Sequence, residues 1–353
     1  MKIAFLTEYT EMGGGESNLI NLAQELNKTE DVTIFCSGKV KEEAQKIDIK
    51  TIDFTSSKRW VKFFPLIGIN SRLKDLLGEF DIVHAYSVNV LPLLIGLDRK
   101  IVWTTHGYWE KPFGLRARVI NLLVDKVIAV STDVEKICEF PNNKLTKIFL
   151  GVKLNNSKVT PNQWKHNIIR IVSIGRFQKI KGQDILVKAA KILTEKNPNL
   201  ELKIIFVGDV NGNNPENIQF KELVVNLAKI YENNRLQFEF AGFKNDVSNY
   251  IDAANFIVIP SRYESFSMVA IEGLSRGRPI LAPNIGGPID IVTKEVGFFY
   301  AVGEALAMAE AMNCLINNCN KYSDKNCIER AKLFSIEKQC DAHIDVYQEL
   351  LSD

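Results

Sequence analysis

Two glutamates eight positions apart, Glu264 and Glu272, mark the stretch of this sequence best suited to bind a ligand. They lie where an apolar strand at residues 257–260 is predicted to pass through a polar loop into a helix. Such a turn, at the carboxyl edge of an α/β sheet, offers free helix amides and a dipole end that favours anions. A sugar or a ribose lying there could donate hydroxyl hydrogen bonds to both carboxylates. The plainer alternative is that both are solvated surface residues.

The loop between the glutamates carries further polar groups. Ser265 or Ser267 is expected to cap the helix, because a serine hydroxyl accepts a hydrogen bond from a first-turn amide. The free amides of Phe266, Ser267 and Met268 are predicted to meet a phosphate. This turn therefore suits a ligand that has both hydroxyl and phosphate groups.

The stretch resembles the Glu-x7-Glu signature of retaining, nucleotide-sugar-dependent glycosyltransferases with the GT-B fold, the group 1 or family 4 type. The resemblance includes a preceding Pro-Ser and the following Gly273. A second match lies upstream, where a Gly-Arg…Lys-Gly loop at residues 175–182 joins a predicted strand at 168–174 to a predicted helix at 183–196. A chance match to both motifs, in the family's order, is improbable.

The resemblance implies a role for each residue of the two motifs. Arg176 and Lys181 would hold the donor diphosphate, since fixed cations stabilise the charge that grows as it leaves. Glu264 would bind hydroxyls of the donor sugar, and Glu272 would bind the ribose. Phe243, which follows a predicted strand in the second half, is assigned to the base pocket. We expect Arg176, Lys181 and Glu264 to be catalytic.

A glycine run in the first half, Gly13-Gly14-Gly15-Glu16, follows the first predicted strand and opens a helix. It is not the dinucleotide fingerprint, and no acidic residue ends the second strand at residues 32–37, so a nicotinamide cofactor is disfavoured. In the resembled family a Gly-Gly followed by Glu lies against the donor diphosphate, which implies that role for the amides of Gly14 and Gly15. A plain flexible turn is the alternative.

Two histidines, His84 and His106, lie at the ends of predicted strands. The resembled family commonly has a histidine at the second of these positions, near the donor sugar, and this implies a catalytic role for His106. For His84 a satisfied structural histidine is a live alternative.

Strands and helices alternate in both halves, which predicts parallel sheets covered on both faces. The polar, aperiodic residues 153–167 are the expected linker. We predict an N-terminal Rossmann-like, acceptor-binding domain at 1–155 and a C-terminal Rossmann-like, donor-binding domain at 165–334. By resemblance, the two domains face a central cleft and a helix at 335–353 crosses back to the N-terminal domain. In the first half, the later strands are expected at 50–54, 81–86, 100–105 and 126–130, and the helices at 63–77, 91–97, 115–124 and 132–139.

Composition sets further limits. A chain of 353 residues suits two domains, and a net charge of +2 implies no general attraction to nucleic acid. No apolar run reaches the roughly 18 residues needed to span a bilayer, and no signal peptide is expected. The 6 cysteines form no C-x-x-C pair and the 4 histidines show no ligand spacing. Buried, reduced thiols, a cytoplasmic location and no metal site are therefore expected.

Two segments, at residues 58–64 and 108–118, combine cations with aromatic side chains. One interpretation is an interfacial patch that contacts anionic lipid on the inner face of the cell membrane and admits a lipid-linked acceptor. Trp60, Phe64, Trp109 and Arg116 would then touch the membrane. The other interpretation is a solvated face over core anchors.

Taken over nearly the whole chain, the resemblance implies a hexosyltransferase that acts with retention. The donor would be a nucleotide-diphosphate sugar, with UDP the expected carrier. The acceptor would be a hydroxyl of a saccharide or lipid-linked saccharide in bacterial surface-polysaccharide or glycolipid synthesis. Because the sequence holds no Asp-x-Asp pair, neither a metal nor another cofactor is expected.

Two rival functions remain at this stage. A nucleotide-sugar epimerase of the same fold would need no acceptor, so nucleotide release that depends on acceptor distinguishes the two. A catalytically silent partner that only binds nucleotide sugar would have no reason to keep Arg176, Lys181, Glu264 and Glu272 together.

Overall fold

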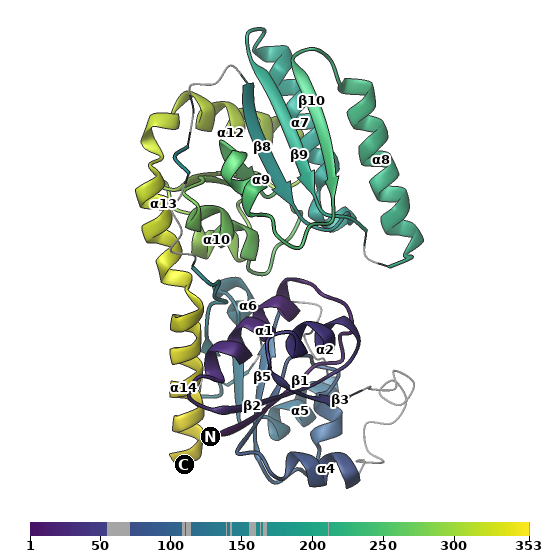
Figure 1. The fold of residues 1–353 in the computed structure, drawn as a ribbon, viewed down its shortest axis with the longest axis vertical. Coiled ribbons are helices and arrows are strands. Elements are labelled where there is room, and N and C mark those ends of the chain that lie inside the picture. Colours follow the sequence, from purple (N-terminus) through teal and green to yellow (C-terminus); the bar gives the residue numbers. More distant parts are fainter. Residues whose placement is uncertain are drawn as a thin grey trace. The chain divides into compact units, whose positions relative to one another are not determined.

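The computed structural model describes residues 1–54, 71–107, 110, 114–138, 140–141, 143–154, 160–162, 164, 168–210 and 212–352. The chain divides into two compact units, one formed by Met1–Lys153 with Phe334–Asp353 and the other by Leu154–Leu333 (Figure 1). Each unit is built around one parallel β-sheet. The prediction of two Rossmann-like domains is therefore confirmed.

The first unit contains a seven-stranded sheet in the order β3-β2-β1-β4-β5-β6-β7. The strand order reverses between β1 and β4, and ligands of open α/β sheets bind beyond the carboxyl ends of strands at such a point. The inner strands are almost fully buried because helices cover both faces. The strands are β1 Lys2–Leu6, β2 Asp31–Cys36, β3 Lys50–Asp53, β4 Ile82–Ala85, β5 Lys100–Thr105, β6 Lys126–Ala129 and β7 Leu145–Lys147.

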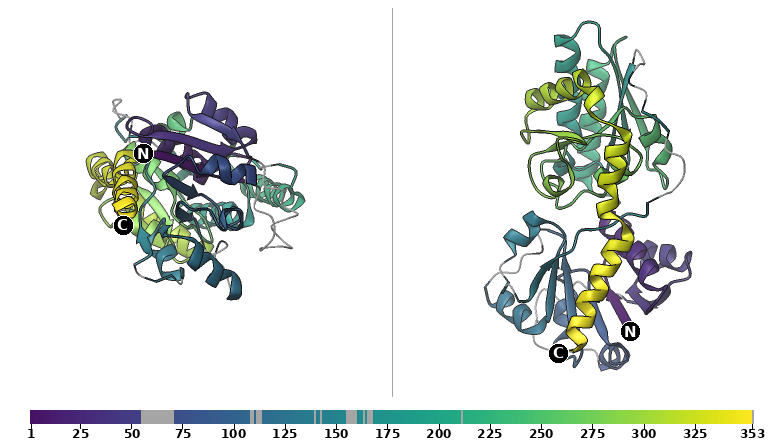
Figure 2. Two further views of the ribbon diagram at one scale, coloured as in Figure 1. Left: turned by 90° about the horizontal axis from the view of Figure 1, so that it is seen from below. Right: turned by 90° about the vertical axis from the view of Figure 1, so that its left-hand side faces the viewer.

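The last helix of the chain, α14, packs against the first helix, α1, in this unit (Figure 2). The buried amides of Asn18 and Gln339 bond to each other reciprocally, at 2.8 and 3.0 Å. Gln339 also accepts from the Gly151 amide at 2.6 Å, so α14 is held by polar as well as apolar contacts. The helices are α1 Gly14–Leu26, α2 Gly38–Gln45, α4 Ser71–Leu77, α5 Gly114–Leu123, α6 Thr132–Ile137 and α14 Ile336–Ser352.

The second unit contains a six-stranded parallel sheet in the order β10-β9-β8-β11-β12-β13. Its order reverses between β8 and β11, which places the carboxyl ends of these two strands at the switch point. The strands are β8 Ile168–Ile174, β9 Glu201–Val207, β10 Leu236–Gly242, β11 Phe256–Val258, β12 Ile280–Pro283 and β13 Gly297–Tyr300. The helices are α7 Gln183–Lys196, α8 Pro215–Tyr231, α9 Ser248–Ala253, α10 Met268–Ser275, α11 Pro288–Ile291, α12 Ala305–Asn317 and α13 Asp324–Ala331.

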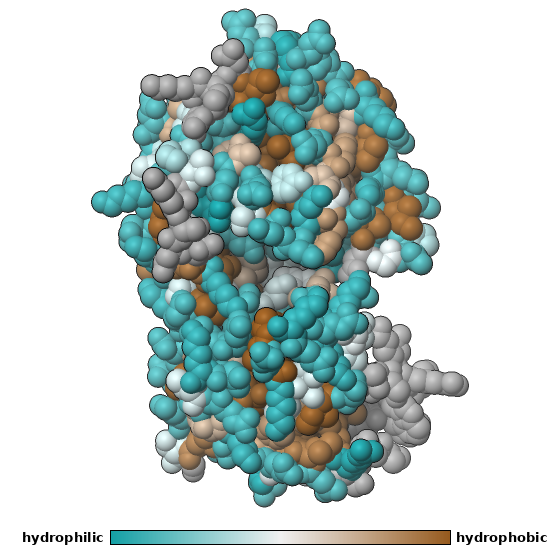
Figure 3. Space-filling view, in the orientation of Figure 1, coloured by the Kyte–Doolittle hydropathy of each residue, from teal (hydrophilic) through white to brown (hydrophobic). Residues whose placement is uncertain are grey.

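Helix α8 shows how sequence spacing fixes the inner face of a covering helix. Phe220, Val224 and Ala228 recur every fourth residue and are buried where α8 packs on α7 and on the edge strand β10. Other apolar side chains of α8, among them Ile230, which is 72% exposed, face outward and form apolar surface over this helix in Figure 3.

Two expectations are wrong in detail. Residues 91–97 do not form an α-helix. A single 3₁₀ turn spans Leu91–Leu94, and the backbone leaves helical geometry at Ile95, with a ψ of 125°, and at Gly96, with a φ of +74°. None of the described cysteines forms a disulfide, but Cys314 is exposed and Cys138 and Cys319 are only half-buried. Within the described ranges, the helices are too short or too polar to cross a membrane.

Candidate active site

The loop that carries Arg176 and Lys181 is fixed in the second unit by close backbone contacts. Gly182 has a φ of +67° and ends a 3₁₀ turn at Lys179–Lys181 before α7 begins. A Cβ atom at Gly182 would lie 2.0 Å from the Pro260 carbonyl oxygen, so only glycine allows the loop to lie against the end of β11. This close approach brings Lys181 beside the loop that carries Glu264.

Lys181 and Glu264 form an ion pair at the carboxyl ends of β8 and β11. The Lys181 Nζ atom is 2.8 Å from Oε2 of Glu264, and the Ser261 hydroxyl donates to the same oxygen at 3.0 Å. Both side chains are largely buried, with exposed fractions of 28% for Lys181 and 15% for Glu264. The structure thus brings together two predicted site residues that are far apart in sequence.

A second contact holds the same two loops in register. The Arg262 guanidinium binds both carboxylate oxygens of Asp184, at 2.8 and 3.0 Å, in a fork geometry. The Arg262 amide also donates to the Ile180 carbonyl at 2.7 Å. Asp184 lies in the first turn of α7, so this helix start helps to position the Glu264 loop.

The glycine turn at Gly286 and Gly287 supports Glu264 from the other side. Gly286 has a φ of +69°, and a Cβ atom there would lie 2.1 Å from the Glu264 carbonyl oxygen. The Gly287 amide donates to that same carbonyl at 2.9 Å. The turn therefore fixes the backbone that carries Glu264 and Phe266, and it tolerates no side chain at Gly286.

Ser267 corrects the expectation of a serine cap on α10. It is the residue before the helix, but neither its hydroxyl nor another side chain caps the helix. Its φ of +97° and ψ of +80° lie in a region that favours glycine. The strained turn leaves Phe266 buried and starts α10 at Met268. Of the three amides predicted to meet a phosphate, only that of Met268 belongs to the helix, and those of Phe266 and Ser267 lie in the turn before it.

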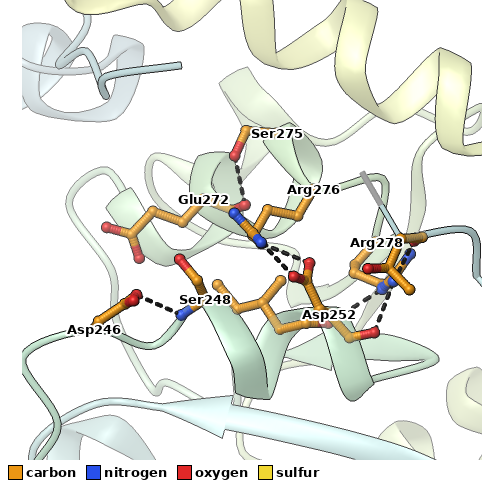
Figure 4. A network of polar contacts seen from close by, with 9 residues as sticks. Asp246, Ser248, Asp252, Glu272, Ser275, Arg276 and Arg278 are labelled. Atoms are coloured by element: carbon orange, nitrogen blue, oxygen red, sulfur yellow. Dashed lines mark hydrogen bonds and ion pairs between the residues drawn. The ribbon is translucent and has the colours of Figure 1, made fainter. Parts of the chain in front are cut away.

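Glu272 lies in α10, and its carboxylate points away from the ion pair between Arg276 and Asp252 (Figure 4). Among the described residues its side chain has no hydrogen-bond or ion-pair partner, because the nearby Arg276 binds Asp252 instead. Burial raises the pKa of Glu272. A half-buried acceptor without a partner is available to a ligand, as the predicted ribose contact requires.

Two further predicted residues of the second unit are open to solvent. Arg176 is exposed, and its guanidinium contacts no carboxylate among the residues that the structure describes. Phe243 is 68% exposed directly after β10. An aromatic ring so placed is free to stack on a planar ligand.

In the first unit the structure brings Gly15 beside His106. A Cβ atom at Gly15 would lie 3.7 Å from the His106 ring, so the start of α1 faces the end of β5. Gly14 is the first residue of α1. Burial lowers the pKa of His106 to about 4, so its imidazole is neutral at physiological pH. Its Nε2 atom is buried without a hydrogen-bond partner in the described structure.

His84 is a structural residue. It is fully buried, and its ring nitrogens bond to the Tyr347 hydroxyl at 2.6 Å and the Thr104 hydroxyl at 2.7 Å. Both ring nitrogens of His84 thus have hydrogen-bond partners inside the core, which agrees with the alternative that His84 is a satisfied structural histidine.

Glu110 was not predicted as a site residue; it lies four residues after His106 and is 3% exposed. Its Oε2 atom accepts from the His106 amide at 2.6 Å. A lone glutamate among aromatic residues gives no sequence signal of burial.

The residues predicted to contact a membrane, Trp60, Phe64 and Trp109, lie outside the described residues, as does the side chain of Arg116.

Comparison with known proteins places this chain in a family. Residues 156–334 match the family described as glycosyl transferases group 1, and residues 12–155 match glycosyltransferase family 4. A solved structure of Anabaena HepE in complex with UDP and glucose has the same fold, with a TM-score of 0.81 and 22% identity over 99% of both chains. The chain is a two-domain GT-B protein, and it belongs to the group 1 glycosyltransferases.

Curated relatives agree with this assignment. An uncharacterized glycosyltransferase of Haemophilus influenzae is 27% identical over 342 residues, which cover 91% of this chain and 93% of that protein. A D-inositol 3-phosphate glycosyltransferase of Corynebacterium glutamicum is 27% identical over 168 residues, or 47% of this chain. That match covers only 40% of the relative's length.

Proposed function

We propose that this glycosyltransferase moves a hexose with retention from a UDP-sugar to a saccharide hydroxyl, and that it needs no divalent metal. The pathway we propose is the synthesis of a bacterial surface polysaccharide or glycolipid. The observation that carries the proposal is the 2.8 Å Lys181–Glu264 pair, held where two glycine-dependent loops meet at a switch point. A cation and a sugar-binding carboxylate are both needed where a sugar–diphosphate bond breaks.

The proposed reaction assigns the growing negative charge to the second unit. As the bond between the anomeric carbon and the diphosphate breaks, Lys181 and Arg176 stabilise the departing phosphate, together with the free amides at the start of α10. The acceptor oxygen bonds to the same face of the anomeric carbon, and its proton passes to the departing phosphate oxygen. Glu264 accepts hydrogen bonds from the sugar hydroxyls, and Glu272 from the ribose.

UDP is the carrier we favour. HepE, which has the same fold, holds UDP and glucose in its solved structure. In this chain, the exposed ring of Phe243 is suited to stack on a base. Glu272 has no side-chain partner within the described ranges, so its carboxylate is available to accept hydrogen bonds from ribose hydroxyls.

The described residues contain no group of three or more His, Cys, Asp or Glu side chains that could hold a metal ion. Arg176 and Lys181 are the cations that we propose in place of one.

Isothermal titration with UDP, GDP and ADP, each alone and as its glucose conjugate, tests the donor assignment in the presence of EDTA. We expect UDP and UDP-glucose to bind, and Glu272→Ala to weaken both. Binding of GDP or ADP in preference to UDP would contradict the proposed carrier, and binding only after Mg²⁺ is added would contradict the absence of a metal.

A further inference from the structure

Glu110 is a buried carboxyl group that the proposed reaction does not use. It lies beyond the carboxyl end of β5, in the first unit, and is 3% exposed. Its Oε2 atom accepts a hydrogen bond from the His106 amide at 2.6 Å. Its other oxygen, Oε1, is buried and has no hydrogen-bond partner among the described residues.

A second unsatisfied atom lies in the same short segment. The Nε2 atom of His106 is also buried without a partner within the described structure. Buried polar atoms are nearly always hydrogen-bonded, and leaving one unpaired is costly. Two such atoms lie four residues apart beyond the carboxyl end of β5, which neighbours β4 at the switch point. We infer that a polar ligand completes the site.

The surroundings of Glu110 favour its neutral form. Burial raises its pKa to about 8, and the Glu16 carboxylate adds to the rise. The hydrogen bond from the His106 amide opposes it, as do the nearby Val88 amide and Thr105 hydroxyl, although neither reaches hydrogen-bond geometry with Oε1. Tyr9, which also faces Glu110, is a neutral phenol near pH 8, because burial raises its pKa to about 12. No lysine or arginine is among the described groups that act on Glu110.

A neutral carboxyl group has one oxygen that accepts and one that donates. Since Oε2 accepts a hydrogen bond from the His106 amide, the proton belongs on Oε1. The resulting O–H group is a donor that has no acceptor among the described residues. A hydroxyl oxygen of a saccharide would fill that position, and another hydroxyl of the same sugar could bond to Nε2 of His106.

We propose that Glu110 is a further substrate-contacting residue, which as a neutral acid donates a hydrogen bond from Oε1 to a saccharide hydroxyl. The inference rests on the proposed function, because it assumes a sugar substrate. It differs from a purely structural role, in which Glu110 would only tie the ends of β4 and β5 together.

Glu110→Gln tests this inference, because a glutamine keeps both the acceptor and the donor but cannot lose a proton. We expect it to retain most of the transfer activity, whereas Glu110→Ala should lose roughly tenfold, the scale for one hydrogen bond. Wild-type activity should fall as the pH rises through about 8, where the acid loses its proton. Glu110→Gln should lack that fall.

Two further measurements make the outcome decisive. Separate titrations of donor and acceptor show which substrate supplies the hydroxyl, because Glu110→Ala should raise the KM for that substrate alone. In ¹³C-labelled protein, a carboxyl resonance that is absent from Glu110→Gln should titrate near pH 8 without any substrate.

The contradicting results are equally specific. An active wild type with an inactive Glu110→Gln would show that the carboxylate is the working form and would overturn the inference, while leaving the proposed function intact. An unchanged fall of activity in Glu110→Gln, or a Glu110 resonance that titrates near 4.5, would also overturn it. A wild type that transfers no sugar from any UDP-sugar would contradict the proposed function itself.

Discussion

The two cations proposed to bind the diphosphate, Lys181 and Arg176, differ in burial. Lys181 is largely buried and paired with Glu264, whereas Arg176 is exposed and has no carboxylate partner in the described structure. A buried cation in a fixed geometry stabilises developing charge better than a mobile one, because it needs no reorganisation. We therefore expect Lys181 to contribute more to the rate than Arg176.

Replacing Lys181 should slow the transfer step. For Lys181→Ala we expect kcat to fall by roughly 10²- to 10³-fold, the scale for losing one preorganised donor. Lys181→Arg should recover only part of this, because a planar fork cannot occupy the place of an ammonium group without moving the loop. Lys179→Ala is the matched control, since this exposed lysine lies in the same turn. Equal rates for Lys181→Ala and Lys179→Ala would remove Lys181 from the mechanism.

Replacing Glu272 should weaken donor binding. A charged hydrogen bond contributes about 1.5 to 3 kcal/mol, so Glu272→Ala should raise the Kd for UDP by roughly 10- to 100-fold. Calorimetry measures the change, and Glu272→Gln, which keeps one acceptor, should fall between wild type and alanine. If the Kd of Glu272→Ala matches that of wild type, the ribose assignment is wrong.

At the scale of elements, the site is built by loops that only glycine permits. Gly182 lies against Pro260, and Gly286 lies against Glu264, each at a distance that excludes a Cβ atom. These contacts set the relative positions of three loops at the carboxyl edge of the sheet. Activity should therefore be sensitive to changes that leave every charged residue in place.

Gly286→Ala is the direct test of this loop contact. Its Cβ atom would meet the Glu264 carbonyl at 2.1 Å, so the Glu264 backbone must move. Gly303→Ala is a matched control, because Gly303 has a φ of +82° with no atom within 4 Å of a Cβ. Both variants pay a left-handed backbone cost of about 1 to 2 kcal/mol, but only Gly286→Ala should also lose transfer activity. Similar activities in the two variants would show that the glycine turn does not position Glu264.

The sequence predicted elements better than it predicted their contacts. Residues 183–196 were expected as a helix, and α7 has these bounds, because periodic apolar residues between a glycine loop and a polar end fix it locally. The left-handed backbone of Ser267 and the burial of Glu110 depend on distant loops. No local pattern could reveal them.

The same distinction applies to the site. The motifs located Lys181 and Glu264, but their pairing depends on Gly182, Pro260 and Ser261. The serine cap on α10 was expected from residue type alone, and that prediction was wrong. The backbone before α10 is set instead by the close approach of Phe266 to Gly287.

At the scale of the whole molecule, several histidines of the first unit are buried and neutral. Burial lowers the pKa of His343 to about 4 and that of His84 well below its usual value, as it also does for His106. The unfolded chain binds protons at these positions below about pH 6.5, whereas the folded chain does not. Their contribution therefore lowers stability as the pH falls from about 6.5 toward 4.

Glu110 acts in the opposite direction. Its raised pKa means that the folded chain holds an extra proton between about pH 4.5 and 8, so its contribution to stability falls as the pH rises through that window. Burial also raises the pKa of Glu272, which acts in the same direction as Glu110. Three histidines outweigh these two glutamates below pH 6.5. We expect the net stability to fall on acidification from pH 6.5 to 5.

Denaturant unfolding between pH 5 and 7 checks this expectation. The free energy of unfolding should decrease below pH 6.5, and His343→Gln, which cannot titrate, should show a shallower decrease. A free energy that is constant over this range, or equal slopes for the two proteins, would contradict the assignment of buried neutral histidines.

We propose that this protein transfers sugar with retention and without a metal. The most direct measurement follows the anomeric proton of the new linkage by ¹H NMR, with an α-linked UDP-sugar as donor and a saccharide acceptor in excess EDTA. We predict an α-linked product that forms at the same rate with and without EDTA. A β-linked product, or turnover that stops in EDTA and returns with Mg²⁺ or Mn²⁺, would contradict the account.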